Sequence, residues 1–162
     1  MLRAFFCLAL LAPAAARADA PPGGDPRLAR QDWVLYCQGC HRAGATGSPD
    51  TAPALKDFVA RFVQVRGGRE YLARVPGVAS APLPDAELAG LLNWVLWRFD
   101  AADLPASFRP FNATEMAKLR RQPLRTEAPA ERRRLLHEFS KTRASMPTNM
   151  TVGPPRCDDS LE

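Results

Sequence analysis

One short motif constrains this chain of 162 residues more than any other feature: residues 37–41 read Cys-Gln-Gly-Cys-His. Two thiols at this spacing match the separation of the two vinyl groups of haem, and the histidine that follows is placed to reach the iron. The motif therefore predicts covalent attachment of one haem c through Cys37 and Cys40, with His41 as the proximal iron ligand. Aromatic residues just upstream and the signs of export described next strengthen this interpretation.

The first 18 residues have the features of a secretory signal peptide. Arg3 gives a positive start, residues 4–12 form an apolar run, and small residues up to Ala18 offer a cleavage site. The apolar run is too short to span a bilayer, and no later segment is long and apolar enough to do so. We therefore expect an exported, periplasmic protein with no transmembrane segment after cleavage. Residues 19–25 are expected to form a flexible leader.

The cysteine count favours haem over the other uses of a Cys-x-x-Cys pair. Three cysteines remain after signal cleavage, so they cannot all pair in a disulfide framework. A structural zinc site needs about four ligands, and only Cys157 or His137 could complete one. A thioredoxin-like role would require a βαβ context, and no strand pattern is visible. Cys157 is either a thiol without a role or the site of an intermolecular crosslink.

Basic residues gather in the C-terminal third of the chain. Residues 118–143 contain nine basic and three acidic side chains. A solvated helix face explains this pattern, and a docking patch for an acidic redox partner or a membrane surface is the alternative. Nucleic acid is not expected as a partner because no aromatic or glycine pattern accompanies the arginines.

The periodicity of apolar residues predicts an all-α fold. Asp25 and Pro26 are typical of an N-cap and first helical position, and this helix runs on to the cysteine motif. The clearest helix covers residues 84–99, where apolar residues spaced by three and four from Leu88 onward form one stripe. The other expected helices are shorter and lie at residues 57–65, 69–75, 113–121 and 130–143. We divide the mature chain into a haem domain (26–100), a helical extension (101–144) and a disordered tail (145–162).

From about Asp25 to Phe99 the chain resembles a class I c-type cytochrome. In that family an N-terminal helix runs into Cys-x-x-Cys-His and is crossed by a later helix, and Trp33 stands where an aromatic residue packs at the crossing. Pro53 stands where the family supplies a backbone carbonyl to the histidine ring. The resemblance thus implies a cytochrome c-like helical domain in which the Pro53 carbonyl orients His41.

The chain departs from that family at the sixth iron ligand, which is usually a methionine in the loop before the last helix. Residues 75–83 occupy this loop and contain no Met, His or Lys. Four weaker candidates follow later in the chain: Met116, His137, Met146 and Met150. The sixth ligand is therefore left unknown, and an iron with water or no ligand on that side is an equal alternative.

Three arginines, Arg66, Arg69 and Arg74, lie in the segment that faces the haem edge in the family. In one interpretation, one of these arginines neutralises a haem propionate. In the other, all three belong to a solvated face. The sequence alone does not separate these interpretations.

The favoured function is that of a periplasmic monohaem cytochrome that carries single electrons between redox partner proteins, with a periplasmic dehydrogenase as a candidate donor. The alternative is a haem protein with an open sixth iron position, acting as a small-ligand sensor or a peroxidase-like enzyme. We favour an electron carrier over a catalyst because no motif indicates a distal His or Arg, which a peroxidase uses to assist cleavage of the O–O bond. The partners, the oligomeric state and the reduction potential are not given by the sequence.

Overall fold

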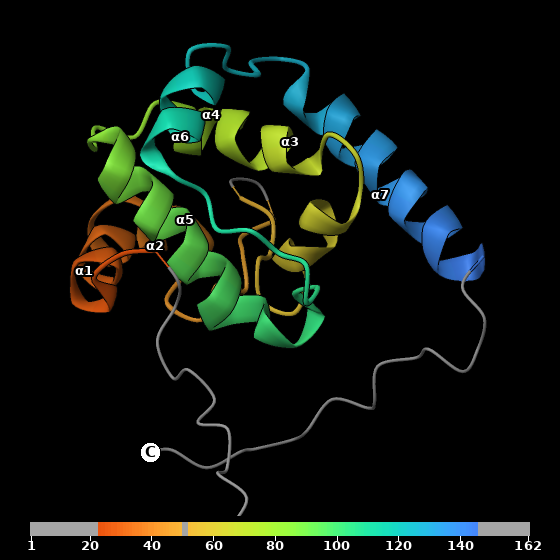
Figure 1. Ribbon diagram of the computed structural model, residues 1–162, viewed down its shortest axis with the longest axis horizontal. Coiled ribbons are helices and arrows are strands. Elements are labelled where there is room, and N and C mark those ends of the chain that lie inside the picture. The colour runs from red at the N-terminus through yellow and green to blue at the C-terminus, as the bar shows by residue number, and fades with distance from the viewer. Residues whose placement is uncertain (1–22, 50–51, 146–162) are drawn as a thin grey trace, which may run out of the picture.

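The computed structural model describes residues 23–49 and 52–145, and within these residues the chain is helical and contains no β-strand (Figure 1). In chain order the elements are α1 (Pro26–Tyr36), α2 (Gln38–His41), the 3₁₀ helix η1 (Val59–Gln64), α3 (Gly68–Arg74), α4 (Pro76–Ala79), α5 (Asp85–Asp100), the 3₁₀ helix η2 (Ala101–Asp103), α6 (Ala113–Leu119) and α7 (Ala128–Ser145). The predicted all-α fold class is confirmed for this part of the chain. The predicted signal peptide lies outside the described residues, and so does the predicted tail except for Ser145, which is the last residue of α7.

Helix α1 begins where the sequence predicts. The Asp25 carboxylate accepts a hydrogen bond from the backbone N–H of Arg27 at 2.8 Å, and Pro26 occupies the first turn, where its missing N–H has no cost. The buried face of α1 carries Asp32 and Trp33 and packs against α5. The cysteine motif is therefore fixed to a helix that packs against the most buried helix of the fold.

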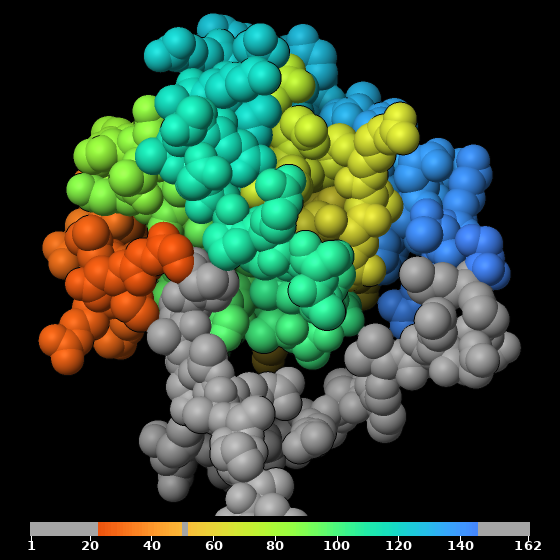
Figure 2. All heavy atoms as spheres, viewed as in Figure 1, coloured from red at the N-terminus to blue at the C-terminus, as the bar shows by residue number. Residues whose placement is uncertain are grey.

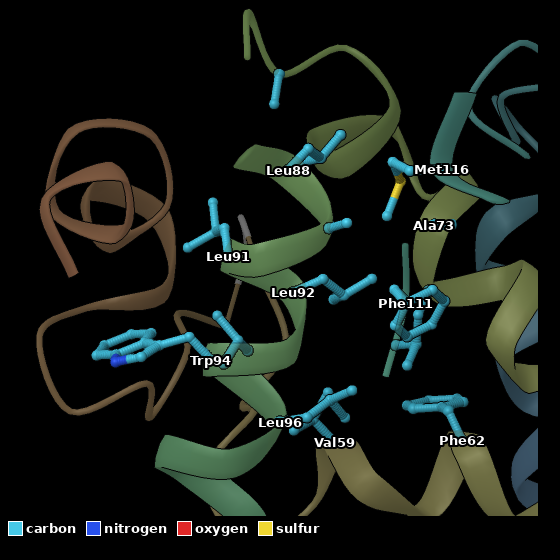
Figure 3. Packing of buried hydrophobic residues seen from close by; sticks show 14 of the residues in the cluster. Val59, Phe62, Ala73, Leu88, Leu91, Leu92, Trp94, Leu96, Phe111 and Met116 are labelled. Carbon is cyan, nitrogen blue, oxygen red and sulfur yellow. The ribbon is translucent and has the colours of Figure 1, made fainter. Parts of the chain in front are cut away.

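Helix α5 is the centre of the molecule. Every residue from Leu88 to Leu96 is buried, because α1, α6 and η1 pack against α5. The single apolar stripe predicted for this helix is therefore too narrow. Figure 3 shows Trp94 on the α1 side of α5, and Phe111 and Met116 on the opposite side.

A buried polar side chain on α5 explains how the chain after α5 is held. Asn93 is 1% exposed, and its amide donates to the backbone oxygen of Phe111 at 2.9 Å and accepts from the backbone N–H of Phe111 at 2.8 Å. Both polar groups of the side chain are thus satisfied, as burial requires. The extended segment before α6 is tied to α5 by this pair of hydrogen bonds.

Two predicted elements differ in kind from the observed ones. The helix expected over residues 57–65 is a six-residue 3₁₀ helix, and Gly68 lies close against its backbone: a Cβ on Gly68 would lie 1.7 Å from the Phe62 oxygen. The loop expected over residues 75–83 contains the single turn α4, which Pro76 starts from its first position.

Helix α7 begins earlier than the sequence predicts. It starts at Ala128 rather than Ala130 because Pro129 lies inside its first turn, where the missing N–H would have no intrahelical partner. In Figure 1 α7 lies along one side of the molecule, where it packs against η1 and α3.

The core is continuous across the predicted boundary between residues 100 and 101. One hydrophobic cluster includes Trp33, Leu96, Phe111, Met116 and Leu135. The division into a haem domain and an extension stays a prediction, while the packing joins the described parts of both. No helix in the described ranges has the length and apolarity that crossing a membrane requires.

Candidate functional site

The cysteine motif lies at a break between two helices. α1 ends at Tyr36, Cys37 caps it by donating its N–H to the Trp33 oxygen at 3.0 Å, and α2 then carries Cys40 and His41. The backbone N–H groups of Cys40 and His41 both donate to the Cys37 oxygen, at 3.2 and 3.0 Å. Cys37 is half-buried, Cys40 is exposed, and both are free thiols. The break therefore gathers both thiols and the imidazole within one tight turn.

The ring of His41 is oriented by the backbone. Its Nδ1 lies 2.9 Å from the Pro53 oxygen, and since a carbonyl only accepts, Nδ1 carries the proton and Nε2 keeps its lone pair. Burial lowers the pKa of His41, and the hydrogen bond to Pro53 opposes this change without reversing it. The imidazole is thus neutral near pH 7, with one nitrogen tied and the other available to a metal.

The loop after the motif brings Pro53 to the histidine by an unusual backbone path. The N–H of Gly47 donates to the His41 oxygen at 3.0 Å, and the Ala45 oxygen accepts from the N–H groups of Leu55 and Lys56 at 2.8 and 3.1 Å. Gly47 has a φ of +76°, which favours glycine, and Ala45 has a φ of +56°. These bonds close the loop on itself and hold Pro53 opposite the ring.

Aromatic side chains cover the buried side of the site. The Trp33 ring centroid lies 6.1 Å from that of His41, 4.7 Å from that of Phe99 and 6.3 Å from that of Trp94. Trp33 is 3% exposed and fills the crossing of α1 and α5. The aromatic residue that the sequence places four positions before Cys37 therefore packs at this crossing, next to the imidazole.

The Cys37 thiol is not prepared for reaction as a thiolate. Burial raises its pKa to about 11, and the nearby Asp32 and Cys40 add to the rise. A thiol that stays protonated near pH 7 is a poor nucleophile. In the described parts of the chain, no group of three or more Cys, His, Asp or Glu side chains could hold a metal ion by itself. The raised pKa of Cys37 speaks against a reactive thiolate in the metal-free protein.

Asp32 is a buried carboxyl beside the motif that the sequence analysis did not single out. It is 4% exposed, and its Oδ2 has no hydrogen-bond partner among the described residues. Burial raises the pKa of Asp32, and the charge of Glu87 raises it further. The only sequence signal is an acidic residue directly before Trp33 on the inner face of α1.

Two of the four candidates for a sixth iron ligand, Met116 and His137, lie in the described part of the chain. Met116 is fully buried in α6 and lies on the opposite side of α5 from Trp94, away from the Trp33 side where His41 lies (Figure 3). His137 is on α7 with an exposed side chain, its Nδ1 3.9 Å from a Glu138 carboxylate oxygen. Met146 and Met150 lie outside the described residues. Neither described candidate is brought to the motif.

Residues 75–83, the loop in which the family supplies a sixth iron ligand and this chain has no Met, His or Lys, are held by a residue that the sequence analysis missed. Arg120, at the C-terminal end of α6, donates to the backbone oxygens of Ala79 at 3.2 Å, of Leu83 at 2.8 Å and of Ala81. It also pairs with the Asp85 carboxylate at 3.2 Å. No sequence pattern indicates this role, because the partners are mostly backbone oxygens some 40 positions away.

The three arginines considered for haem propionates have different surroundings. Arg69 forms a two-bond ion pair with Glu115, at 3.0 and 2.8 Å, and its guanidinium lies 3.9 Å from the centre of the Phe111 ring. Arg74 donates to the Gln122 oxygen at 2.5 Å. Both of these arginines hold the C-terminal part of the chain, so for them a purely solvated face is wrong. Arg66 is exposed.

Comparisons with curated proteins point to one family. No protein-family model matches the chain, and no solved structure matches it. The chain is 35% identical over 134 residues to a cytochrome c-552 of Thermus thermophilus, an alignment that spans 69% of this chain and 90% of that protein. It is also 35% identical over 118 residues to a second Thermus thermophilus cytochrome c-552, spanning 61% of this chain and 90% of that one.

Within the described residues the fold is helical, and two free thiols and an oriented imidazole lie at the break between its first two helices. The chain belongs to the c-type cytochrome family, as its relation to the two Thermus thermophilus proteins shows.

Proposed function

We propose that the protein is a monohaem cytochrome in which Cys37 and Cys40 form thioether bonds to one haem and His41 binds its iron. The observation that carries this proposal is the 2.9 Å hydrogen bond from His41 Nδ1 to the Pro53 oxygen. It leaves Nε2 as the free nitrogen, in the same turn as two unpaired thiols. The names of the two relatives support the same cofactor.

The residues at the motif fit a haem. A haem ligand needs an imidazole with one nitrogen tied, and a thioether needs a free thiol, and both are present. Trp33 packs beside the imidazole and Phe99 packs against Trp33, so one side of the site is apolar. When bound, the haem supplies an iron that changes between two oxidation states. The chain would hold the haem, orient the histidine ligand of the iron and set the polarity of the haem's surroundings.

We further propose that the protein is exported to the periplasm and carries single electrons between redox proteins, with a dehydrogenase as a candidate donor. The signal-like first 18 residues support export. An electron carrier needs a haem that is held permanently and a surface that partners can reach. Covalent bonds at the exposed Cys40 and half-buried Cys37 would provide both.

The test is haem retention in the purified mature protein. We expect a haem that survives acid–acetone extraction and a reduced spectrum of the c type. Cys37→Ser and Cys40→Ser should each leave one thioether bond at most, and the double variant should release its haem. Cys157→Ser is the matched control and should keep it. A colourless wild-type protein would refute the proposal.

A second candidate function is binding of a small ligand at an open iron position. One observation favours it: Arg120 ties down the segment in which a sixth ligand is expected, and that segment contains no Met, His or Lys. Rapid binding of carbon monoxide by the reduced protein would support this function. Failure to bind carbon monoxide would exclude it and leave the electron carrier.

A further inference from the structure

A surface pocket of about 570 Å³ lies between α3 and the start of α7, two helices that pack against each other. On one side its lining residues are Gly67, Glu70, Tyr71 and Arg74, and on the other side they fall between residues 124 and 134. No residue of the cysteine motif lines it. In Figure 2 the atoms of α7 lie next to those around α3, on the other side of the molecule from α1. We call this hollow the α3–α7 pocket.

A buried phenol faces the α3–α7 pocket without a partner. Tyr71 is 7% exposed, and its ring stacks on that of Phe62 with 4.9 Å between the centroids. Its hydroxyl makes no hydrogen bond within the described ranges, and because it is not sealed from solvent it opens into the pocket. Buried tyrosine hydroxyls usually find a partner. The pocket therefore offers a hydrogen-bonding group that a ligand could satisfy.

The charged side chains around the α3–α7 pocket are only partly paired. Arg134 donates two hydrogen bonds to Glu131, at 2.8 and 2.6 Å, and Glu127 accepts one from a backbone N–H at 2.8 Å. Glu70 and Arg74 are four residues apart on α3, a spacing at which such residues often pair. They form no ion pair with each other or with any other described residue.

The guanidinium of Arg74 is fixed beside the pocket with its outer end free. Its Nε donates to the Gln122 oxygen at 2.5 Å, and its two terminal nitrogens have no partner among the described residues. Hydrogen bonds from Arg134 lower the pKa of Glu131, and the charge of Arg74 lowers it further, so Arg74 lies near the α7 wall. One pocket thus contains an unpaired cation and, at Glu70, an unpaired anion.

We propose that the α3–α7 pocket binds a small zwitterion, namely a free amino acid with an apolar side chain. Its carboxylate would bind the terminal nitrogens of Arg74, since a guanidinium fits a carboxylate with two parallel hydrogen bonds. Its ammonium would bind Glu70, and the Tyr71 hydroxyl would complete the polar contacts. Leu124 gives the pocket an apolar wall for the side chain. This inference goes beyond the proposed function and does not depend on the position of the haem.

The experiment is isothermal titration calorimetry of the haem-loaded protein with three probes that share one carbon skeleton. Leucine carries both charges, 4-methylpentanoate lacks the ammonium, and 3-methylbutylamine lacks the carboxylate. Leucine should bind, and each single-charge probe should bind at least about tenfold more weakly, because it leaves one charged side chain unpaired.

Variants assign the two charges to their residues. Glu70→Gln and Arg74→Gln should each weaken leucine binding by about tenfold, and Tyr71→Phe by about threefold. Glu87→Gln and Arg133→Gln are the matched controls, because they make the same changes at residues that do not line the pocket. Arg74 also holds the Gln122 backbone, whereas Glu70 is exposed, so Glu70→Gln tests the site without disturbing the fold.

Three outcomes would overturn the zwitterion proposal: no heat of binding with millimolar leucine, equal affinity for leucine and either single-charge probe, or unchanged leucine affinity in Glu70→Gln. The haem spectrum of the same samples reports separately on the proposed function. A protein that is colourless but binds leucine would refute the proposed function alone, and a haem-loaded protein that does not bind leucine would refute the zwitterion proposal alone.

Discussion

At the scale of single residues, the site depends on a glycine that lets the backbone return to the histidine. Gly47 has a φ of +76°, and a Cβ there would lie 2.5 Å from the Ala54 nitrogen and 2.7 Å from the Ala52 oxygen. Neither backbone atom can give way without moving Pro53, which lies between them. The orientation of His41 is thus decided six residues away from it.

We therefore expect Gly47→Ala to break the hydrogen bond between His41 and Pro53. Loss of this bond makes the imidazole a weaker electron donor, so the reduction potential of the haem protein should rise. Potentiometric titration measures the change. Gly77→Ala is the matched control, because a Cβ at Gly77 meets no atom within 4 Å. Equal potentials for the two variants would show that the bond does not tune the iron.

Asp100 is a second residue whose environment has a measurable consequence. It is 5% exposed, accepts a hydrogen bond from the Ala60 N–H at 2.6 Å, and has its pKa raised by burial to about 7. The hydrogen bond from Ala60 and the charge of Arg61 lower this pKa, whereas Asp57 and Asp103 raise it. Folding thus favours the protonated carboxyl, so ionisation costs stability as pH rises from about 4 to about 7.

Asp100→Asn keeps an oxygen for Ala60 and removes the charge. The variant should be more stable than the wild type above pH 7, and this difference should shrink as pH falls toward 4. Urea unfolding at several pH values measures the difference in free energy of unfolding. Glu70→Gln, at an exposed carboxylate, is the control and should give a small difference. A difference for Asp100→Asn that does not change with pH would contradict this account.

At the scale of elements, the sequence predicts helices well where the signal is local. Asp25 and Pro26 predict the start of α1, and the spacing of apolar residues from Leu88 onward predicts α5. Both predictions succeed because capping and periodicity depend only on neighbouring residues. The turn α4 and the 3₁₀ geometry of η1 were missed. The backbone contact of Gly68 with Phe62 is not contained in an apolar periodicity, and Pro76 by itself fits a loop as well as the first position of a helix.

The same limit applies to the candidate site. The motif could be named from its spacing, and Pro53 from the resemblance to the family. Arg120 and Asn93 could not, because each binds backbone atoms, and backbone atoms carry no sequence signal. The proposal that a haem propionate pairs with Arg69 competes with its ion pair to Glu115, 46 positions later.

Arg120 gives a prediction about the segment between α4 and α5. Arg120→Gln should lower the free energy of unfolding by about 1.5–3 kcal/mol, because backbone oxygens lose a charged hydrogen-bond donor. Arg121→Gln, one position further and exposed, should change it by less than about 0.5 kcal/mol. Urea unfolding of both variants at one pH measures this. An Arg120→Gln variant as stable as Arg121→Gln would mean that the hydrogen bonds from Arg120 are not needed to stabilise the segment between α4 and α5.

At the scale of the whole molecule, the packing joins the described chain before and after residue 100. Arg69 stacks on Phe111 and pairs with Glu115, and Asn93 pairs with the Phe111 backbone. Phe111 is 2% exposed and belongs to the cluster that also contains Trp33. We infer that both parts unfold together, although the sequence suggests a domain and an extension.

Phe111→Ala tests this inference. The cavity should cost about 3–5 kcal/mol, with a smaller cost for the half-buried control Phe108→Ala. The three tryptophans all precede residue 100, so their fluorescence reports one part of the chain while far-UV circular dichroism reports every helix. The two unfolding curves should coincide in the wild type and shift together in Phe111→Ala. A circular dichroism transition that precedes an unchanged fluorescence transition would show that the extension unfolds separately.

The central claim is that one haem is bonded covalently to the turn between α1 and α2. Mass spectrometry of the exported protein and of its proteolytic fragments tests it most directly. We predict an intact mass increased by one haem, with the whole increase on the fragment that contains Cys37 and Cys40. An unmodified mass, or haem mass on any other fragment, would contradict it.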